Sequence, residues 1–382
     1  MKRKMKMGMI GGGPGAFIGA VHRMAAVLDG QIELVCGAFS QTPEKSKAMT
    51  ESLYLNSNRV YNNFQEMIEG EKLLPIGERM DFVSIVTPNH MHFLPAKLAL
   101  ENGFSVICDK PVTLNSQEAE ELAALATRKN LTFALTHNYT GYPMVKEARS
   151  LIRNGALGKI RKIVVEYPQG WLAGPLEKTG QKQAGWRTNP KEAGISCCMG
   201  DIGSHAENLC EYITGLKISA LCADLTTFID GRLLDDDGNV LVRFDNGAKG
   251  VLYASQVSVG EENNLMIRIY GEKGGLEWRQ LEPNTLLFKK AEGHTQIIRT
   301  GVGPLSAEAQ MHTRLPPGHP EGYLEAFANL YRNFAAVLQA KEMGVATDER
   351  MDFPTIQDGV RGMRFIEAVV KSSQSEQKWV SL

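Results

Sequence analysis

Three side chains in the sequence could together move a proton and stabilise negative charge on an oxygen. Lys110 lies two residues after the end of an apolar run at 104–108, and Asp201 and His205 are four positions apart. A neutral imidazole can accept a hydroxyl proton near neutral pH. An ammonium group can stabilise a developing oxyanion, and a carboxylate can bind a hydroxyl or orient the base. We therefore consider Lys110, Asp201 and His205 as candidate catalytic residues.

The same three residues also have a purely structural interpretation. Lys110 could be a surface lysine in a loop, and Asp201 with His205 could form an exposed i,i+4 ion pair on a helix. The spacing predicts a helix over 201–214, whose apolar stripe we expect in the core: Ile202, Ala206, Leu209 and Ile213. The polar stripe beside it, which Asn208 and Tyr212 continue, is then free to face a cleft.

A metal site in the same segment is the third interpretation. Its possible ligands are Asp201, His205, Cys197, Cys198 and Cys210. Adjacent cysteines suit tetrahedral zinc poorly, and an i,i+4 pair supplies only two ligands on one face, so we expect no metal. The six cysteines form no C-x-x-C pair, which favours small buried side chains in a reducing compartment.

A glycine-rich turn near the start of the chain follows the first expected strand, 5–10. The segment Gly11–Ala16 matches G-x-G-x-x-(G/A) and leads into a helix expected over 16–28. Glycines let a backbone approach a pyrophosphate, and a helix N-terminus supplies oriented N–H groups. We therefore expect a dinucleotide contact from the turn and the helix start, through Gly11, Gly13, Pro14, Gly15, Phe17 and Ile18. The alternative is a plain glycine-rich turn.

The end of the second expected strand, 32–38, bears on the identity of the nucleotide. An unphosphorylated ribose is commonly bound by an acid at this point, but the sequence reads Gly37-Ala38-Phe39-Ser40. Ser40 could bond a ribose hydroxyl or a 2′-phosphate, and Lys45 and Lys47 are near enough in sequence to favour a phosphate. The sequence leaves NAD and NADP open, and we expect NAD.

Alternating apolar runs and helices indicate how these residues are positioned. Buried strands at 81–86, 104–108 and 131–136 follow the first two, with helices between them. This pattern predicts a doubly wound parallel sheet of the Rossmann type over residues 1–136. Lys110 then lies at the carboxyl end of a strand, where ligands bind in open α/β sheets.

The remaining residues, 137–382, predict a second domain of the α+β class. Strand-like runs at 160–166, 220–228, 239–244, 249–257, 265–270 and 275–279 predict a large open sheet that is mostly antiparallel. Helices are expected at 201–214, 321–341 and 355–372, and 301–320 is expected to be a long loop. The run Asp235-Asp236-Asp237 lacks the later glutamate of a calcium loop, so we expect a solvated turn.

Composition excludes several classes of partner. The chain has 382 residues with a formal net charge of −1, whereas nucleic acids and anionic membranes demand a basic excess. No uninterrupted apolar stretch approaches the roughly 20 residues of a spanning helix. The basic start runs at once into the glycine turn, unlike a signal peptide. We therefore expect a cytoplasmic protein with a small-molecule substrate.

Several motifs together resemble the Gfo/Idh/MocA family of nicotinamide-dependent sugar and cyclitol dehydrogenases. The strongest is Cys108-Asp109-Lys110-Pro111, where the family usually has Glu-Lys-Pro. The glycine turn, the stretch Gly155–Ile160 and the pair Asp201 and His205 agree with it, as do Thr87-Pro88-Asn89 and His92. The resemblance implies a Rossmann domain, an open-sheet domain used for oligomerisation, and a homodimer or homotetramer. It also implies cofactor contacts from Thr87, Pro88, Asn89, His92, Asp109 and Lys110.

The resemblance further implies how the candidate residues act. His205 takes the hydroxyl proton as hydride leaves the same carbon, Lys110 polarises that oxygen, and Asp201 fixes the diol. Trp171, Trp186, Arg187 and Tyr139 are expected to bind the substrate, because aromatic faces pack on sugars and arginine forks bond hydroxyls. The tryptophans could instead be buried for packing. The expected substrate is a glucoside or free pyranose oxidised at C3. Alternatives are a cyclitol dehydrogenase, a glycoside-cleaving relative that uses NAD transiently, and a non-catalytic nicotinamide-binding sensor.

Overall fold

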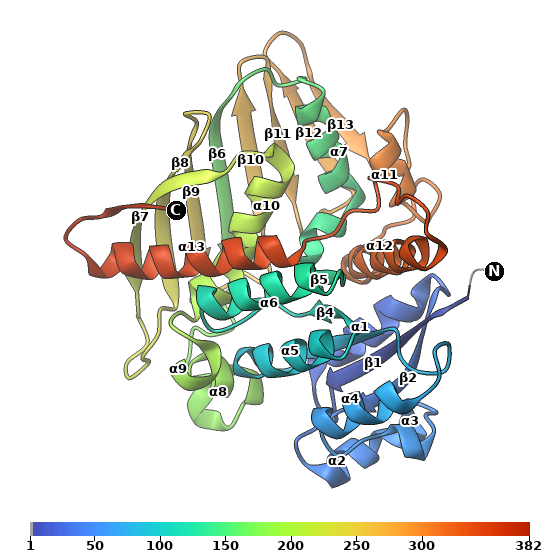
Figure 1. Ribbon diagram of the computed structural model, residues 1–382. Coiled ribbons are helices and arrows are strands. Elements are labelled where there is room, and N and C mark those ends of the chain that lie inside the picture. Colours follow the sequence, from blue (N-terminus) through green and yellow to red (C-terminus); the bar gives the residue numbers. More distant parts are fainter. Residues whose placement is uncertain (1–2) are drawn as a thin grey trace. The chain divides into compact units, whose positions relative to one another are not determined.

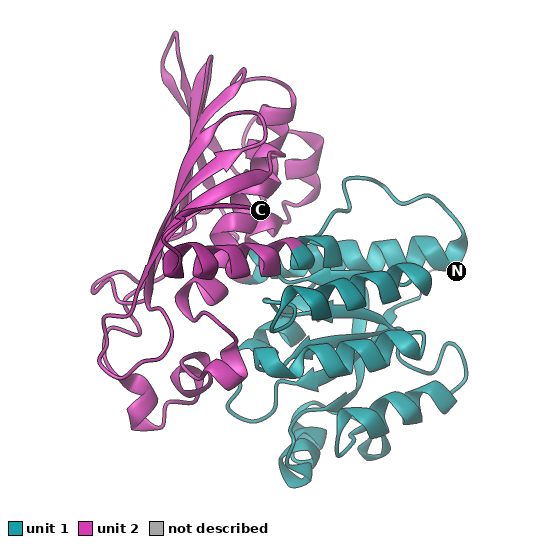
Figure 2. Cartoon of the chain, turned by 60° about the vertical axis from the view of Figure 1, so that its left-hand side comes forward, with its two compact units in different colours: residues 1–138, 324–360 teal, residues 139–323, 361–382 magenta. Residues whose placement is uncertain are grey.

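The computed structural model describes residues 3–382, which form two compact units (Figure 2). Unit 1 comprises residues 1–138 and 324–360, and unit 2 comprises residues 139–323 and 361–382. The first division lies beside the predicted boundary at 136–137. The segment 324–360 differs from the prediction, because it belongs with the N-terminal sheet rather than with the second domain.

Unit 1 is built on a five-stranded parallel sheet (Figure 1). Its strands are β1 (Met5–Gly11), β2 (Ile32–Ala38), β3 (Phe82–Val86), β4 (Ser105–Cys108) and β5 (Phe133–Leu135). They run in the order β2-β1-β3-β4-β5, so the order reverses between β1 and β3. Every residue of β3, β4 and β5 is buried, as expected for parallel strands with both faces covered.

The helices of unit 1 alternate with these strands. They are α1 (Phe17–Leu28), α2 (Pro43–Lys47), α3 (Met49–Ser52), α4 (Phe64–Leu73), α5 (Phe93–Glu101), α6 (Ser116–Arg128) and α12 (Tyr323–Met343), with short 3₁₀ turns at Ser57–Arg59, Asn89–Met91 and Asn138–Gly141. Helix α12 belongs to this unit because its aromatic face packs on the sheet. The Phe334 ring lies 5.1 Å from that of Phe82, and the Tyr331 hydroxyl is 2.7 Å from Ser84 Oγ.

Unit 2 contains a nine-stranded sheet. Its strands are β6 (Ile160–Pro168), β7 (Ile218–Thr226), β8 (Asp237–Phe244), β9 (Lys249–Ser255), β10 (Met266–Gly271), β11 (Gly274–Arg279), β12 (Thr285–Lys290), β13 (Thr295–Arg299) and β14 (Trp379–Ser381). All neighbours pair antiparallel except β6 and β9, which are parallel. Burial alternates along β8, as in a sheet with one covered face. The predicted α/β fold with a Rossmann sheet and a mostly antiparallel second sheet is confirmed.

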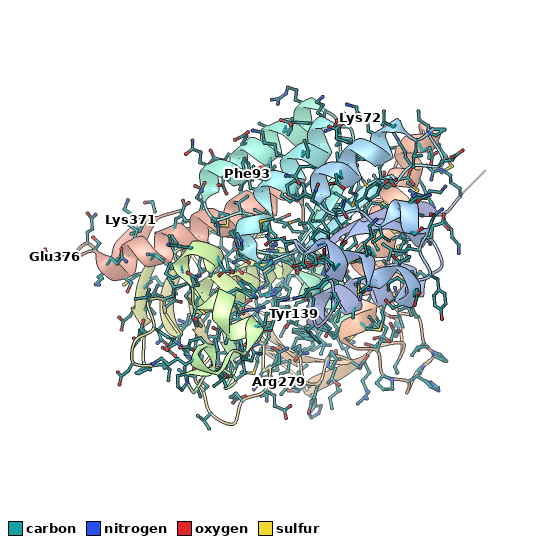
Figure 3. All side chains as sticks on the ribbon, turned by 90° about the horizontal axis from the view of Figure 1, so that it is seen from below. Lys72, Phe93, Tyr139, Arg279, Lys371 and Glu376 are labelled. Carbon is teal, nitrogen blue, oxygen red and sulfur yellow. The ribbon has the colours of Figure 1, made fainter. Side chains whose placement is uncertain are left out.

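The helices of unit 2 are α7 (Pro143–Arg153), α8 (Lys182–Arg187), α9 (Pro190–Ala193), α10 (Ser204–Thr214), α11 (Ala307–Met311) and most of α13 (Ile356–Gln374), with a 3₁₀ turn at Leu176–Thr179. Helices α7 and α10 contact strands of the sheet. In Figure 3, Tyr139 lies among packed side chains, whereas Lys371 and Glu376 lie at the periphery. Within residues 3–382 no helix combines the length and apolarity that a membrane span requires.

Three sequence predictions need correction. Strands β12, β13 and β14 were not predicted, and the expected loop 301–320 contains the helix α11. The run Asp235–Asp237 is buried rather than solvated. Asp235 accepts hydrogen bonds from the backbone N–H groups of Cys197 and Met199 and from Ser196 Oγ, and burial raises its pKa despite these donors.

Candidate active site

The glycine turn of unit 1 adopts a backbone that side chains would block. Gly11, Gly12 and Gly15 have φ values of +88°, +72° and +73°, a region that L-residues rarely enter. A Cβ on Gly13 would lie 2.5 Å from the carbonyl oxygen of Phe39, at the end of β2. The turn therefore presents bare backbone at the carboxyl edge of the sheet, as a pyrophosphate requires.

Helix α1 begins directly after this turn without a side-chain cap. Its N-cap is Ala16, which accepts no hydrogen bond through a side chain, so the first N–H groups remain suited to an anion. Pro14, Gly15 and Phe17 are exposed, and Ile18 is half-buried. These residues fit the pyrophosphate of a dinucleotide.

Gly19 completes this arrangement and was missed in the sequence. A Cβ on Gly19 would lie 2.3 Å from Gly12 Cα, so only glycine lets the helix pack on the turn. The signal that could have found Gly19 is its place in the first turn of the helix that follows the glycine-rich turn.

The end of β2 offers no carboxylate and is pinned by local hydrogen bonds. Ser46 Oγ accepts from Phe39 N at 3.0 Å, and Ser40 Oγ accepts from Thr42 N at 3.1 Å. Lys47 Nζ donates to the carbonyl oxygens of Ser57 and Val60. Because Lys47 is bound by the backbone, it supports a 2′-phosphate less well than the sequence suggested. Lys45 is exposed.

His92 connects two loops at the carboxyl edge of the same sheet. Its Nδ1 lies 2.8 Å from the carbonyl oxygen of Pro111, and its Nε2 lies 2.8 Å from that of Thr87. The side chain is fully buried, and burial lowers its pKa. A direct cofactor contact was predicted for His92, but its buried ring instead supports the loop of Thr87, Pro88 and Asn89 and the loop of Lys110.

Lys110 follows β4 and lies beside a group of buried titratable side chains. Its neighbour Asp109 accepts a hydrogen bond from Thr136 Oγ1 at 2.5 Å and faces His22 Nε2 at 3.4 Å. Burial alone would raise the pKa of Asp109, but His22, Thr136 and His92 lower it to about 2. His137 is buried near Lys110, and burial together with that charge lowers the pKa of His137 to about 3. Asp109 is therefore a largely buried anion that faces His22 of α1, and the cofactor contact expected for it stays a prediction.

In unit 2, Asp201 lies in a π-helical turn, Met199–Gly203, that leads into α10. The Ser204 N–H donates to the carbonyl oxygen of Met199, five residues back. Such single π turns occur frequently at functional sites. The helix predicted over 201–214 exists, and its four stripe residues Ile202, Ala206, Leu209 and Ile213 are buried.

Asp201 accepts hydrogen bonds from two donors on other segments. Its Oδ2 accepts from Arg187 Nε at 3.1 Å and from Gln256 Nε2 at 2.9 Å. The side chain of Asp201 is 17% exposed and that of Arg187 is 22% exposed. Because Asp201 and His205 are both largely buried, an exposed i,i+4 ion pair does not describe them. The hydrogen bonds also add Gln256, which the sequence reading missed because it lies just beyond a strand with no motif around it.

His205 is 8% exposed and is packed between two phenols. Its ring lies 4.9 Å from that of Tyr139 and 6.3 Å from that of Tyr167, both edge-on. The two hydroxyls bond each other, and Asn263 bonds both. Burial raises the pKa of Tyr139 and of Tyr167, so both remain neutral donors at pH 7. The structure thus places Tyr139 against His205, a contact that the sequence did not predict.

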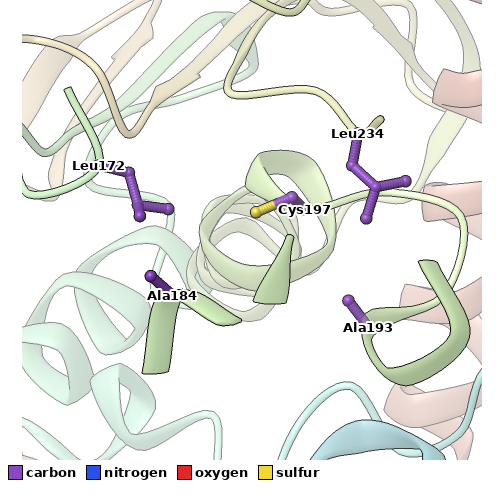
Figure 4. Close-up of a cluster of buried hydrophobic side chains, with 5 residues drawn as sticks. All are labelled: Leu172, Ala184, Ala193, Cys197 and Leu234. Atoms are coloured by element: carbon purple, nitrogen blue, oxygen red, sulfur yellow. The ribbon is translucent and has the colours of Figure 1, made fainter. Parts of the chain in front are cut away.

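Arg187 links Asp201 to the predicted tryptophans. Its guanidinium lies 4.2 Å from the centre of the Trp186 ring and 5.8 Å from that of Trp171, and its Nη1 donates to Gln183 Oε1 at 2.6 Å. Both tryptophans are half-buried. Trp171 also packs against an apolar cluster of Leu172, Ala184, Ala193, Cys197 and Leu234 (Figure 4). Trp171 therefore has a packing role whatever else it binds.

The three cysteines nearest to Asp201 in the sequence are all buried. Burial raises the pKa of Cys197, Cys198 and Cys210. No group of three or more potential ligands converges within residues 3–382. Lys110, Asp109 and His92 thus gather within unit 1, and Asp201, Arg187, His205 and Tyr139 gather within unit 2.

Comparisons with known proteins agree with this division. The oxidoreductase family with an NAD-binding Rossmann fold matches residues 5–137, and the GFO/IDH/MocA C-terminal domain matches residues 145–277. An uncharacterized oxidoreductase of Bacillus subtilis, YfiI, is 33% identical over 390 residues, which span 100% of this chain and 97% of that protein. The chain belongs to the Gfo/Idh/MocA oxidoreductase family. Its N-terminal unit is an NAD-binding Rossmann domain.

Two further relatives carry more specific names. An inositol dehydrogenase homolog from Azotobacter vinelandii, crystallised with NAD⁺, has a TM-score of 0.94 and 33% identity and covers 100% of this chain and 98% of its own. Levoglucosan dehydrogenase of Pseudarthrobacter phenanthrenivorans is 30% identical over 217 residues, 51% of this chain and 54% of that enzyme. Both names describe the relatives, and the substrate of this chain is a separate question.

Proposed function

We propose that this NAD-binding oxidoreductase oxidises a hydroxyl of a sugar or glycoside, with C3 of a pyranose as the favoured position. One observation carries the proposal. In unit 2 a buried histidine, His205, lies in the first turn of α10, and two donors hold the carboxylate of Asp201 in the π-helical turn just before it. A sensor that only bound nicotinamide would need neither group.

The roles of the residues follow from their chemistry. NAD, when bound by the glycine turn and the start of α1, accepts the hydride. His205 accepts the hydroxyl proton through its imidazole. Lys110 donates a hydrogen bond to the same oxygen as negative charge develops on it. Asp201 accepts from a neighbouring hydroxyl, while Arg187 and Gln256 fix its orientation.

Aromatic groups of unit 2 support a sugar rather than a flexible acid as substrate. The ring of Trp186 lies beside Arg187, and that of Tyr139 lies beside His205. Aromatic faces pack well on the C–H face of a pyranose. Since Arg187 is paired with Asp201, its charge is compensated. A neutral polyol therefore fits better than an anionic substrate.

A cyclitol such as inositol is the second candidate. It is favoured by the name of the Azotobacter vinelandii relative, which aligns with the whole chain. A cyclitol has the same vicinal hydroxyls as a pyranose, so His205, Asp201 and Lys110 would keep their roles. We further propose a homodimer or homotetramer, which sedimentation would measure.

The test is nicotinamide reduction with NAD and NADP in parallel against glucosides, free pyranoses, levoglucosan and inositols. We expect NAD reduction with a pyranose or glucoside. The Lys110→Ala variant should lower kcat by about 100-fold or more, because it removes charge stabilisation from the transition state, with little change in NAD affinity. Reduction with inositols alone would overturn the sugar assignment, and unchanged turnover in Lys110→Ala would overturn the assigned role of that residue.

A further inference from the structure

We propose that His22 of α1 is a positioning residue for Lys110, and that it acts through the buried carboxylate of Asp109. The inference rests on the catalytic role proposed for Lys110. All of the side chains involved belong to unit 1. They form a row of polar contacts from Ser84 of β3 through Tyr331 of α12 and His22 of α1 to Asp109, just after β4.

Asp109 is held from two sides. Thr136 Oγ1 donates to its Oδ1 at 2.5 Å, and His22 Nε2 faces the same oxygen at 3.4 Å. The side chain of Asp109 is 16% exposed and that of His22 is fully buried. A carboxylate in such surroundings needs a compensating donor or cation. Thr136 supplies a donor, and the His22 ring faces the same oxygen.

His22 is itself fixed at its other nitrogen. Its Nδ1 lies 2.7 Å from the Tyr331 hydroxyl, which lies 2.7 Å from Ser84 Oγ. The ring also packs edge-on against Phe327 at 4.8 Å. A neutral ring that accepts from Tyr331 carries its proton on Nε2, and a charged ring carries protons on both nitrogens. In both states Nε2 carries a proton and lies 3.4 Å from Asp109 Oδ1, a contact that falls short of hydrogen-bond geometry.

The backbone transmits this restraint to Lys110. The N–H of Asp109 donates to the carbonyl oxygen of Ile85 at 3.0 Å, which continues the pairing of β4 with β3. Lys110 is the next residue and lies in a bend that follows β4. Fixing both the side chain and the N–H of Asp109 therefore fixes the point from which this bend starts.

Several charged or titratable groups surround Asp109. They are His22 of α1, His92 before α5, Cys108 of β4, Lys110, His137 after β5 and Tyr331 of α12. Of these, His22 exerts the strongest pull that keeps Asp109 ionised, ahead of Thr136 and His92. Loss of His22 therefore leaves burial as the dominant influence, which favours the protonated acid.

The decisive variant is His22→Phe, which fills the space and removes both nitrogens. We expect kcat to fall by about 10- to 100-fold, the scale of a displacement of roughly 1 Å of a catalytic group, while KM for NAD changes by less than about threefold. As pH falls, log kcat should decline with a slope of one in the wild type and should steepen from one toward two in His22→Phe once Asp109 also protonates, because its pKa is now higher. The assay uses NAD and the pyranoside or inositol that gives the highest rate.

Two further variants separate positioning from general damage. His22→Gln retains an N–H donor and should recover most of the lost kcat. Adding Asp109→Asn to His22→Phe removes the titrating group and should restore the slope of one. Should His22→Phe fail to fold, Tyr331→Phe removes only the hydroxyl that holds His22, and a smaller loss of kcat with the same change of slope is expected.

A kcat for folded His22→Phe within about threefold of the wild type, with a slope of one, would overturn the inference. If His22→Phe does not fold, a Tyr331→Phe variant with an unchanged kcat and a slope of one would also overturn the inference. Lys110→Ala, measured in the same series, separates this outcome from failure of the proposed function. If Lys110→Ala also turns over normally, the role of Lys110 is wrong. If only the His22 variants are normal, the positioning chain alone is wrong.

Discussion

Gly19 of α1 offers the clearest test of how the nucleotide turn is built. A Cβ at this position would lie 2.3 Å from Gly12 Cα and 3.2 Å from the carbonyl carbon and oxygen of Gly12. Gly12 has little room to yield, because Met9 Sδ would lie 3.1 Å from a Cβ there and Arg23 donates to its carbonyl oxygen at 2.8 Å. In a Gly19→Ala variant, the helix and the turn must therefore separate.

The size of the effect follows from ordinary contact distances. Carbon atoms pack at about 3.5–4.0 Å, so the required separation is more than about 1 Å. Overpacking of this kind costs about 1–3 kcal/mol, and alanine returns about 1 kcal/mol as a better helix former. We expect the free energy of unfolding to fall by up to about 2 kcal/mol, measured by urea denaturation. Because the displaced N–H groups face the pyrophosphate, the Kd for NAD should rise about 10-fold or more, measured by calorimetry.

Gly362 of α13 provides a matched control. It also lies inside a helix, but a Cβ there would meet only Glu207 Oε2, at an ordinary 4.0 Å. Gly362→Ala should raise the free energy of unfolding by up to about 1 kcal/mol and leave the Kd for NAD unchanged. If Gly19→Ala bound NAD as tightly as the wild type, the close packing of α1 on the turn would not be what shapes the nucleotide site.

Two other predictions concern unit 2 and the thiols. Asp201→Ala leaves the donors of Arg187 and Gln256 without their shared acceptor and should lower the free energy of unfolding by about 3 kcal/mol. Asp201→Asn retains an oxygen for both and should cost about 1 kcal/mol; equal losses in urea titrations would contradict the geometry. Five of the six cysteines are buried, so a thiol reagent should label Cys222 rapidly and the others only after unfolding. Rapid labelling of several thiols in the native protein would contradict the described burial.

Much of unit 1 could be predicted because its strands are continuous apolar runs. Both faces of β3 and β4 are buried, and this shows directly as unbroken hydrophobic sequence. The exposed strand β13 carries mostly polar side chains, so no such signal existed for it. Helix α12 was predicted, but its membership of unit 1 depends on contacts such as Tyr331 with Ser84, which join residues 247 positions apart in the chain.

The candidate site was predictable to the extent that it consists of short motifs. The glycine turn, Lys110 and the pair Asp201 and His205 could each be found from spacing or resemblance. Their partners could not be found in this way, because Gln256, Asn263 and Tyr167 come from strands or strand ends with no motif of their own. The acidic run at 235–237 was wrongly predicted to be a solvated turn. Its partners are backbone N–H groups and Arg232, which no sequence motif announces.

The most direct test of the central claim is to follow deuterium from a labelled sugar. Methyl glucoside carrying deuterium at C3 would be incubated with the enzyme and NAD, and the nicotinamide product analysed by mass spectrometry. Our account predicts that the deuterium appears on the reduced cofactor and that the sugar product is the 3-keto glucoside. Reduced cofactor without deuterium would place the oxidation at another carbon. The absence of reduced cofactor with every pyranose and inositol, despite tight NAD binding, would contradict the proposed dehydrogenase activity.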